Sequence, residues 1–422
     1  MSAVAREVST ARREGSRASP LRAGPNVEPA QFSVIRRQLL LKHCKWDPQV
    51  ADVSTLAPFP LLMGRRCWSE LEALAERLTT ELLAAEQELL PREELHSVLA
   101  IPRALRRILR NSGRTGVAPS AVRVMRFDFH WTESGWQISE VNADVPGGFS
   151  EASEFTRLMS AAFPPASIPG DPARLWATRI AAAAEGRPIA LLAASGFMED
   201  HQVVSYLAQA LRELGVDARL AGPLQLQWES GCARLNGNAL GAVVRFYQVE
   251  WLPELPRRSQ WSFLLIGGRT PVTNPLGCIF GETKRFPLVW DSLRSELPTW
   301  RRLLPETRDP RDAPWRADES WLIKAAWCNT GDSVSARGFI PDREWRRASW
   351  SATLFPRGWI AQRRFDPVPV ASPIGDVYPC IGVYTIDGRA AGAYTRISTN
   401  RVIDHRAIDA ALLLAEESGN EL

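Results

Sequence analysis

Residues 122–144 have the sequence VRVMRFDFHWTESGWQISEVNAD, and no other stretch says more about the architecture of this chain. Apolar and polar residues alternate on both sides of a short polar segment, which predicts two antiparallel strands joined by a tight turn. A three-residue loop, Glu133-Ser134-Gly135, would place Gly135 at the left-handed position that such loops require. In that register Thr132 lies opposite Trp136. A two-residue loop would put the polar residues of the two strands on opposite faces.

Polar side chains occupy one face of this hairpin. Arg126, Asp128 and His130 point to one side of the first strand because side chains alternate along it, and Glu140 and Asn142 share a side of the second. The three-residue loop puts Asp128 opposite Glu140 and Arg126 opposite Asn142. Carboxylates directly opposite each other repel, and a cation removes that repulsion. Two carboxylates and a carboxamide are oxygen ligands that suit Mg²⁺ shared with nucleotide phosphates.

The opposite face of the first strand is apolar. It carries Met125, Phe127, Phe129 and Trp131, which predicts that it packs against a core. The polar face then points to solvent or into a cleft, and a solvated face that tolerates the repulsion is the alternative interpretation. His130 is either a base or, as buried histidines commonly are, a structural side chain.

The first half of the chain predicts helices followed by an α/β unit. Apolar spacing indicates helices at 68–90 and roughly 94–111, and a further helix at 150–163 with Ser150 as its cap. Residues 188–220 predict a βαβ unit, one edge of an open sheet in which ligands sit at the carboxyl ends of strands. Shorter strands are expected at 242–248 and 263–266.

The last third predicts mainly strands. A Pro- and Arg-rich stretch at 305–316 is typical of a linker. Strands are expected at 320–327, 358–363 and 380–397, the last a hairpin whose Asp387-Gly388 turn suits a type I′ loop. A closing helix is expected from about His405 to Glu417. Lys324 lies in the apolar strand WLIKAAW, where its charge needs an anion such as phosphate; a lysine extending to solvent from an edge strand is the alternative.

The motif RFD, followed after a gap by EVNADVPGG, resembles the ATP-grasp domain of glutathionylspermidine synthase. In that family an Arg, an Asp two residues on and a Glu-x-Asn after the hairpin supply a catalytic arginine and the magnesium ligands. The resemblance implies that Arg126 is catalytic and that Asp128, Glu140 and Asn142 hold Mg²⁺. The family is a circularly permuted ATP-grasp, so its metal ligands precede its nucleotide lysines, as in this order of motifs. The amidase half of some members is not expected, because no Cys/His nucleophile pattern precedes the hairpin.

The same resemblance assigns the nucleotide side of the site. It implies that Lys324 and Lys284 bind ATP phosphates and that Gln362 lies at the adenine hinge. Taken alone, Lys284 is more typical of a surface lysine. The loop CNTGDS has one glycine and an acid where the family has a more basic, glycine-rich loop. Arg396 and Asn400 either face the site or lie on an ordinary strand surface. The segment Pro146-Gly147-Gly148 either admits an acidic substrate or is a plain turn.

The expected fold class is α/β (α+β), an ATP-grasp fold with a Rossmann-like α/β substrate subdomain and an N-terminal helical region. We expect five segments: a disordered tail at 1–33, with a transit peptide as the alternative; helices at 34–118; the metal-binding hairpin and helix at 119–185; the Rossmann-like subdomain at 186–275; and the nucleotide-binding lid with the remaining ATP-grasp domain at 276–422.

The implied activity is ATP-dependent ligation of a carboxylate to an amine through an acyl phosphate, releasing ADP and phosphate. ATP and Mg²⁺ are the expected cofactors, and a small-molecule or peptide carboxylate and an amine are the expected substrates. A non-catalytic ATP-binding protein of the same fold and a metal-dependent hydrolase that uses Asp128 and Glu140 without ATP are the alternatives.

Composition excludes several other classes. The net charge of +4 argues against nucleic acid as the main partner. No apolar run reaches the length of a membrane span, so no membrane partner is expected. The six cysteines are scattered without a CxxC pair, which argues against a zinc or redox motif and for reduced thiols in the cytoplasm.

Overall fold

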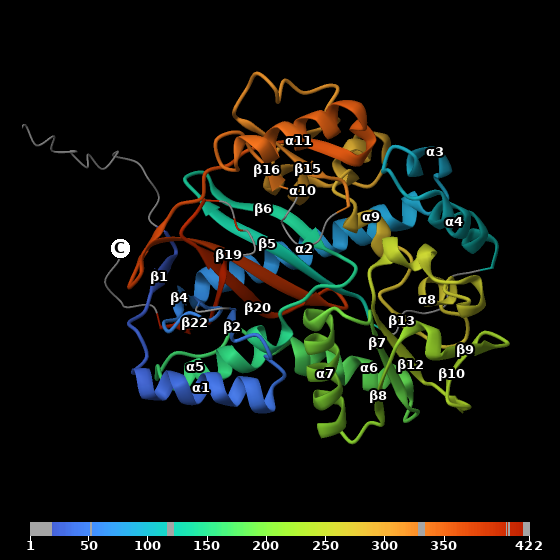
Figure 1. Cartoon of the computed structure of the whole chain (residues 1–422), viewed down its shortest axis with the longest axis horizontal. Helices are drawn as coiled ribbons and strands as arrows, with labels where there is room; N and C mark the ends of the chain where they lie inside the picture. The colour runs from blue at the N-terminus through green and yellow to red at the C-terminus, as the bar shows by residue number, and fades with distance from the viewer. Residues whose placement is uncertain are drawn as a thin grey trace, which may run out of the picture.

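The predicted hairpin lies at the centre of the molecule (Figure 1). The computed structural model describes residues 19–50, 53–115, 122–327, 334–401, 403 and 406–416. The hairpin strands join an antiparallel sheet of order β21-β20-β19-β5-β6, to which β18 adds beside β19. These strands are β5 (Val124–Thr132), β6 (Gly135–Asn142), β18 (Val370–Ser372), β19 (Gly375–Ile386), β20 (Arg389–Ser398) and β21 (Ile408–Ala410).

The strand register at the polar residues is the predicted one, but the turn is not. Asp128 pairs with Glu140 and Arg126 with Asn142, whereas Thr132 pairs with Gly135 across a two-residue loop. The register shifts between Asp128 and Phe129, so Ser139 is an extra residue in β6. Such a bulge moves the following side chains to the other face of a strand. It therefore restores the pairing that the short loop would have lost.

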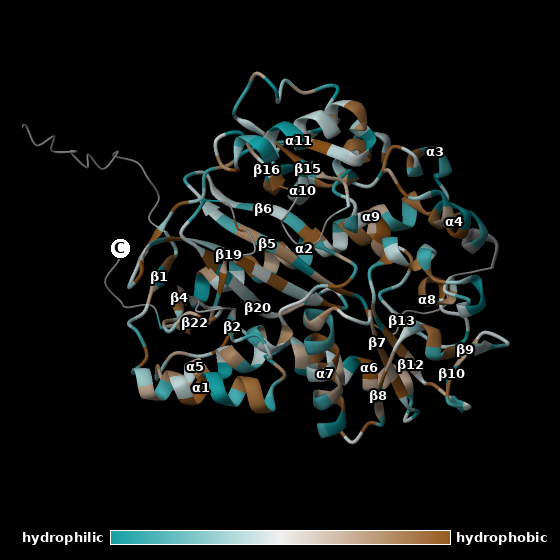
Figure 2. Ribbon diagram, in the orientation of Figure 1, coloured by the Kyte–Doolittle hydropathy of each residue, from teal (hydrophilic) through white to brown (hydrophobic). Residues whose placement is uncertain are grey.

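One face of the central sheet packs on the long helix α2 (Arg65–Leu89), which runs behind β5 and β19 in Figure 1. Met125, Phe127 and Phe129 are fully buried there, as predicted. Burying each of these side chains contributes about 1.5–3 kcal/mol to the free energy of unfolding. The apolar residues of β5 and β19 appear brown in Figure 2. This packing leaves the polar face of the sheet turned away from the core.

A second sheet is parallel and has the order β13-β12-β7-β8. It contains the predicted βαβ unit, formed by β7 (Ile189–Ala193), α7 (Met198–Glu213) and β8 (Ala218–Ala221), and its other strands are β12 (Ala242–Phe246) and β13 (Val272–Thr273). Helix α6 (Pro172–Ala184) packs beside α7. The strand expected at 263–266 was wrong, because these residues form α8 (Phe263–Ile266). An apolar run of four residues has no periodicity that separates a strand from a buried helical turn.

A third sheet, with the order β14-β17-β15-β16, lies above the central sheet in Figure 1. Its strands are β14 (Thr307–Arg308), β15 (Trp321–Ala325), β16 (Val334–Ser335) and β17 (Trp359–Arg363), and α11 (Asp342–Leu354) covers its outer face. We call this sheet and α11 the lid. The linker expected at 305–316 was wrong in part, because β14 pairs with β17 and Asp309 binds Arg285 at 2.6 Å.

The N-terminal region contains strands as well as helices. Residues 19–33, expected in the disordered tail, include β1 (Leu21–Ala23) and the start of α1 (Pro29–Lys42); the tail before residue 19 lies outside the described residues. The helix expected at 68–90 is confirmed as α2. The one expected at 94–111 is split into α3 (Glu93–His96) and α4 (Arg103–Thr115), and Pro102 before α4 lacks the backbone N–H that a continuous helix needs.

One further helix prediction was wrong, and another was confirmed except for its cap. Residues 408–416, expected in the closing helix, form β21 and β22 (Leu412–Ala415) instead. Strand β22 pairs with β4 (Leu61–Gly64), which also pairs with β1. The helix expected at 150–163 is confirmed over residues 149–160, where a π-helical turn, η1 (Glu151–Phe155), continues into α5 (Thr156–Ser160). Its expected cap was wrong, because Ser150 has helical backbone angles and its hydroxyl donates to Glu151 at 2.9 Å.

The remaining short strands are β2 (Gln49–Val50), β3 (Val53–Ser54), β9 (Leu226–Glu229), β10 (Cys232–Leu235) and β11 (Asn238–Ala239). The remaining short helices are α9 (Cys278–Glu282), α10 (Pro298–Leu303), η2 (Pro223–Gln225), η3 (Val249–Glu254), η4 (Arg257–Ser259), η5 (Phe286–Ser292) and η6 (Pro356–Gly358). No helix within the described part of the chain is long and apolar enough to cross a membrane.

Candidate functional site

A buried ion pair lies on the polar face of the central sheet. Arg126 Nε donates to Asp128 Oδ1 at 2.7 Å, and Arg126 Nη2 donates to Oδ2 at 3.0 Å. Arg396 on β20 adds a contact to Oδ2 at 3.3 Å. Burial alone would raise the pKa of Asp128, but the two guanidinium groups lower it below its ordinary value. Asp128 is therefore an anion held in place from two sides.

The ion pair fits only because the neighbouring strand has no side chain beside it. Gly382 on β19 pairs with Asp128. A Cβ atom at Gly382 would lie 2.6 Å from Arg126 Cδ and 2.9 Å from Asp128 Oδ1, closer than such atoms approach. The glycine thus provides the space in which Arg126 and Asp128 lie flat against the sheet.

Glu140 is surrounded by lysines. Lys284 Nζ lies 3.2 Å from Glu140 Oε2, and Lys324 Nζ donates to the carbonyl of Ser139 at 3.1 Å. Burial alone would raise the pKa of Glu140, but Lys284 and Lys324 lower it. Four cations, counting Arg126 and Arg396, thus face the two carboxylates, and this excess of positive charge suits an anionic ligand.

Asn142 completes the predicted metal-ligand set. Its side chain is buried, and its Nδ2 has no hydrogen-bond partner among the described residues. A buried polar group without a partner calls for a ligand, and rotation of the amide would present its oxygen instead. Within the described ranges no cluster of three His, Cys, Asp or Glu side chains could hold a metal. Asp128, Glu140 and Asn142 do carry oxygen atoms of the kind that Mg²⁺ prefers.

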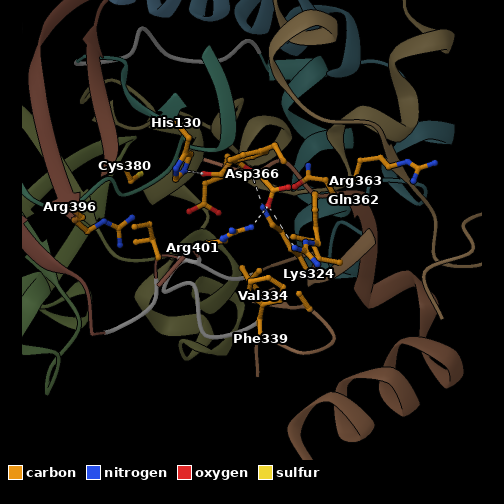
Figure 3. Close-up of a pocket in the computed structure, with 17 residues that line it drawn as sticks. His130, Lys324, Val334, Phe339, Gln362, Arg363, Asp366, Cys380, Arg396 and Arg401 are labelled. Carbon is orange, nitrogen blue, oxygen red and sulfur yellow. Dashed lines mark hydrogen bonds and ion pairs between the residues drawn. The ribbon is translucent and has the colours of Figure 1, made fainter. Parts of the chain in front are cut away.

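A pocket opens between this polar face and the lid (Figure 3). Lys324 on β15 and Gln362 on β17 reach it from the lid, and Arg396 reaches it from β20. Its full lining is His130, Ser139, Glu140, Leu322, Lys324, Val334, Ala336, Phe339, Gln362, Arg363, Arg364, Phe365, Asp366, Cys380, Arg396, Arg401 and Ile403. We call it the nucleotide pocket, after the predicted nucleotide-binding residues Lys324 and Gln362 that line it. It combines apolar side chains with five basic ones.

The lysines and the glutamine come from different elements. Lys324 is buried, and its position next to Leu322 and Gln362 follows from the antiparallel pairing of β15 and β17. Gln362 donates to Thr307 Oγ1 at 2.9 Å. Lys284 follows α9, and its backbone N–H donates to the carbonyl of Ala326 at 3.0 Å. The structure brings all three predicted nucleotide residues to the boundary between lid and central sheet.

The structure shows which of the other residues suggested by the sequence contact the site and which do not. His130 lies 3.1 Å from Ser139 Oγ, and burial lowers its pKa to about 4, which fits a structural histidine and not a base near neutral pH. Asn400 is exposed and does not line the pocket. The carbonyl of Gly147 accepts from Arg126 at 2.9 Å and also from Tyr384, so the 146–148 turn contacts the site. The CNTGDS loop lies outside the described residues.

Sequence reasoning missed two contributors. Gly382 lies in an apolar strand, and nothing in the pattern CIGVYTI distinguishes it from any strand glycine. Arg401 lines the nucleotide pocket and binds Asp366 at 3.1 Å. Arg401 directly follows Asn400, which the sequence had suggested as a site residue. A basic side chain next to that candidate was the signal in the sequence that could have identified it.

Comparisons with known proteins agree with this architecture. The model of the family described as "Glutathionylspermidine synthase preATP-grasp" matches residues 65–409. A glutathione synthetase-like effector from Globodera pallida has a similar structure, with a TM-score of 0.64 at 12% identity over 92% of this chain and 96% of that one. A putative gamma-glutamylcysteine synthetase from Methylobacillus flagellatus has a TM-score of 0.41 at 14% identity, over 80% and 84% of the two chains. No curated protein matches the chain.

Proposed function

This chain belongs to the glutathionylspermidine synthase preATP-grasp family, and from that membership we propose that it is an ATP-dependent ligase that joins a carboxylate to an amine. Its ATP-grasp fold is of the kind found in the synthetase-like neighbour. The observation that carries the proposal is the set of four cations, Arg126, Arg396, Lys284 and Lys324, around the carboxylates of Asp128 and Glu140. Of this cluster, Glu140, Lys324 and Arg396 line a pocket that also has apolar walls.

The nucleotide pocket suits ATP at both ends. Leu322, Val334 and Phe339 supply apolar surface for a base, beside the polar side chain of Gln362. Lys324 and Arg396 approach from opposite walls of the pocket (Figure 3), where they would contact phosphate oxygens. Charge-assisted contacts of this kind are about twice as strong as neutral hydrogen bonds. The pocket thus offers both apolar surface for the base and basic side chains for the phosphates.

Asp128, Glu140 and Asn142 are the residues that would hold Mg²⁺. When bound, the ion neutralises phosphate charge and orients the γ-phosphoryl group. The residues of the chain itself would place the two reactants in line. Arg126 is held by both oxygens of Asp128 and by the carbonyl of Gly147, and in this proposal its guanidinium group would stabilise the charge of the transferring phosphoryl group.

The proposed reaction has two steps. A carboxylate oxygen of the acid attacks the γ-phosphorus of ATP, the bond from that phosphorus to the β,γ-bridging oxygen breaks, and ADP leaves. The amine nitrogen then attacks the acyl carbon of the acyl phosphate, the carbon–oxygen bond breaks, and phosphate leaves with the proton that the amine loses. The protein acts by positioning and by charge stabilisation, as in phosphoryl transfer generally.

A screen for ADP release over pairs of acids and amines tests the function. With a productive acid, ATP and hydroxylamine, the wild-type chain should form a hydroxamate without the natural amine, because hydroxylamine traps an acyl phosphate. Arg126→Lys is the matched variant, since it keeps the charge and loses the planar fork; it should form hydroxamate much more slowly. Ligation that releases AMP and pyrophosphate would overturn the mechanism, and ATP binding without turnover for every pair would favour a non-catalytic nucleotide-binding protein.

A further inference from the structure

A second pocket lies at the carboxyl ends of strands β7, β8 and β12 of the parallel sheet. Residues that follow each of the three strands line it, among them Phe197 after β7, Leu224 after β8 and Tyr247 after β12. Trp251 and Glu254, on η3, complete one wall. We call it the aromatic pocket. It shares no lining residue with the nucleotide pocket.

The topology of the sheet explains why a pocket forms here. Strand β7 has β8 on one side and β12 on the other, and the chain visits β8 before it crosses to β12. The loops after β7 and β12 therefore leave the sheet in opposite directions and open a crevice between them. Ligands of open α/β sheets bind in such crevices.

Three aromatic rings converge in this crevice. The Phe197 and Trp251 ring centroids are 5.0 Å apart at an interplanar angle of 36°, and Tyr247 meets Trp251 edge-on at 6.0 Å and 87°. Phe197 is 51% exposed and Leu224 55% exposed. Apolar side chains that stay this exposed at the mouth of a pocket are typical of a binding surface.

The charge around the aromatic pocket is negative. None of the described residues that line it is basic, and its one charged lining residue is Glu254. Glu199 and Asp200 follow the lining residue Phe197 in the first turn of α7. Arg257 and Arg258 follow in η4 but do not line the pocket. The nucleotide pocket, by contrast, has five basic lining residues, so the two pockets suit ligands of opposite charge.

We propose that the aromatic pocket binds a small organic ammonium ion with an aromatic or branched apolar body. The faces of Trp251 and Tyr247 attract a cation through their ring quadrupoles. Glu254 provides a counter-charge at the same wall, and Phe197 and Leu224 cover the apolar body of the ligand. An anionic ligand of the same shape would meet Glu254 and no basic side chain in the lining.

The aromatic pocket is joined to the candidate ligase site by buried contacts. Asp144, two residues after Asn142, accepts from the backbone N–H of Val249 at 2.7 Å and binds Arg245. Arg245 in turn donates to the carbonyl of Tyr247. Asp144 thus connects the wall that carries Tyr247 and Trp251 to the proposed metal ligand Asn142. With this connection, the ammonium ion is either the amine substrate or a separate effector.

Calorimetry with the full chain and no nucleotide tests the binding directly. Phenethylammonium is the probe, with 2-phenylethanol as its neutral analogue and 3-phenylpropionate as its anionic one. Phenethylammonium should bind best and phenylpropionate worst. Trp251→Leu should weaken phenethylammonium binding by at least about fivefold, as should Glu254→Gln, because each removes a contact to the cation. The exposed controls Trp350→Leu and Glu296→Gln should leave its affinity unchanged. Because Glu254 is exposed, Glu254→Gln tests the site even if Trp251→Leu fails to fold.

The proposal is overturned if phenylpropionate binds as well as phenethylammonium, or if neither pocket variant changes the affinity. A second assay rests on the proposed ligase function and identifies the source of the cation. Incorporation of the amine into an amide, with a KM raised by Glu254→Gln, identifies the substrate. An altered ATP affinity without incorporation identifies an effector. If phenethylammonium binds but no pair of acid and amine releases ADP, the aromatic pocket is supported and the ligase function is rejected. If the chain ligates a pair, neither pocket variant affects that ligation and calorimetry shows no binding, the ligase function is supported and the aromatic pocket is rejected.

Discussion

Arg126 and Asp128 depend on each other because both are buried on the same strand. The sequence predicted that two carboxylates would repel across the hairpin. The structure corrects this expectation, because each carboxylate already has cationic partners. Losing Asp128 would leave the Arg126 charge unpaired in a buried place, which is costly.

Asp128→Asn should therefore lower the free energy of unfolding by about 3–5 kcal/mol, the usual effect of breaking a buried pair. The loss should depend on pH. The folded-state pKa of Asp128 is lowered, so its contribution is fully present above the unfolded value of about 3.9 and is lost as pH falls through the folded value. Urea unfolding of wild type and variant between pH 7 and pH 3 should show curves that converge in acid. A constant separation would contradict the ion pair.

Arg126→Ala tests the proposed catalytic role. A guanidinium group that stabilises charge only in the transition state affects turnover more than binding. We expect kcat for ADP release to fall at least about a hundredfold, with a much smaller change in ATP affinity. An equal loss in both would mean that Arg126 holds the nucleotide instead. Arg301→Ala, on the exposed end of α10, is the control.

Gly382→Ala tests the space beside the ion pair. The added methyl group would meet Arg126 and Asp128 at less than 3 Å, so the pair must shift. We expect a folded protein whose turnover falls at least about tenfold, since small displacements of positioning residues are costly. Gly358→Ala is the matched control, because nothing lies within 4 Å of a Cβ there. Full turnover in Gly382→Ala would show that the geometry of the pair is not critical.

At the scale of single elements, strand β15 carries the clearest prediction. Lys324 is buried and directed at the nucleotide pocket, so Lys324→Met keeps the stem and removes the charge. ATP affinity, measured by calorimetry, should fall roughly tenfold, because a hydrogen bond to a charged group contributes about 1.5–3 kcal/mol. Lys42→Met, at the exposed end of α1, should not change it. An unchanged affinity in Lys324→Met would assign Lys324 a structural role.

The elements also show what the sequence could predict. Alternation in β5 was sufficient to place Arg126 and Asp128 on the polar face and Phe127 on the core face. It could not reveal the bulge at Ser139, because a two-residue loop with a bulge and a three-residue loop without one produce the same pairing of Asp128 with Glu140. The predicted pairing of Asp128 with Glu140 was therefore right, although the predicted three-residue loop was wrong.

The remaining errors have a common physical cause. The run LLLA forms β22 because the chain brings it beside β4, and apolar runs such as FLLI do not specify helix or strand by themselves. Gly382 was not predictable, because its importance depends on Arg126 lying across it from a strand far away in sequence. Local patterns predicted local structure, and the contacts between distant segments supplied the rest.

At the scale of the whole molecule, the candidate site is assembled from both ends of the chain. Strand β5 pairs with β19, and Arg396 reaches Asp128 from β20. The first strand, β1, shares a sheet with the last, β22. A continuous segment that contains the whole site must therefore span most of the chain.

This pairing of early with late strands has a consequence for synthesis on the ribosome. Strand β5 emerges long before β19 can cover its free edge, and β4 emerges long before its partner β22. Non-local pairing of this kind makes folding slow and leaves strand edges exposed meanwhile. A nascent chain therefore cannot assemble the Arg126–Asp128–Arg396 cluster until β20 has emerged, and we expect nucleotide binding to begin only after that point.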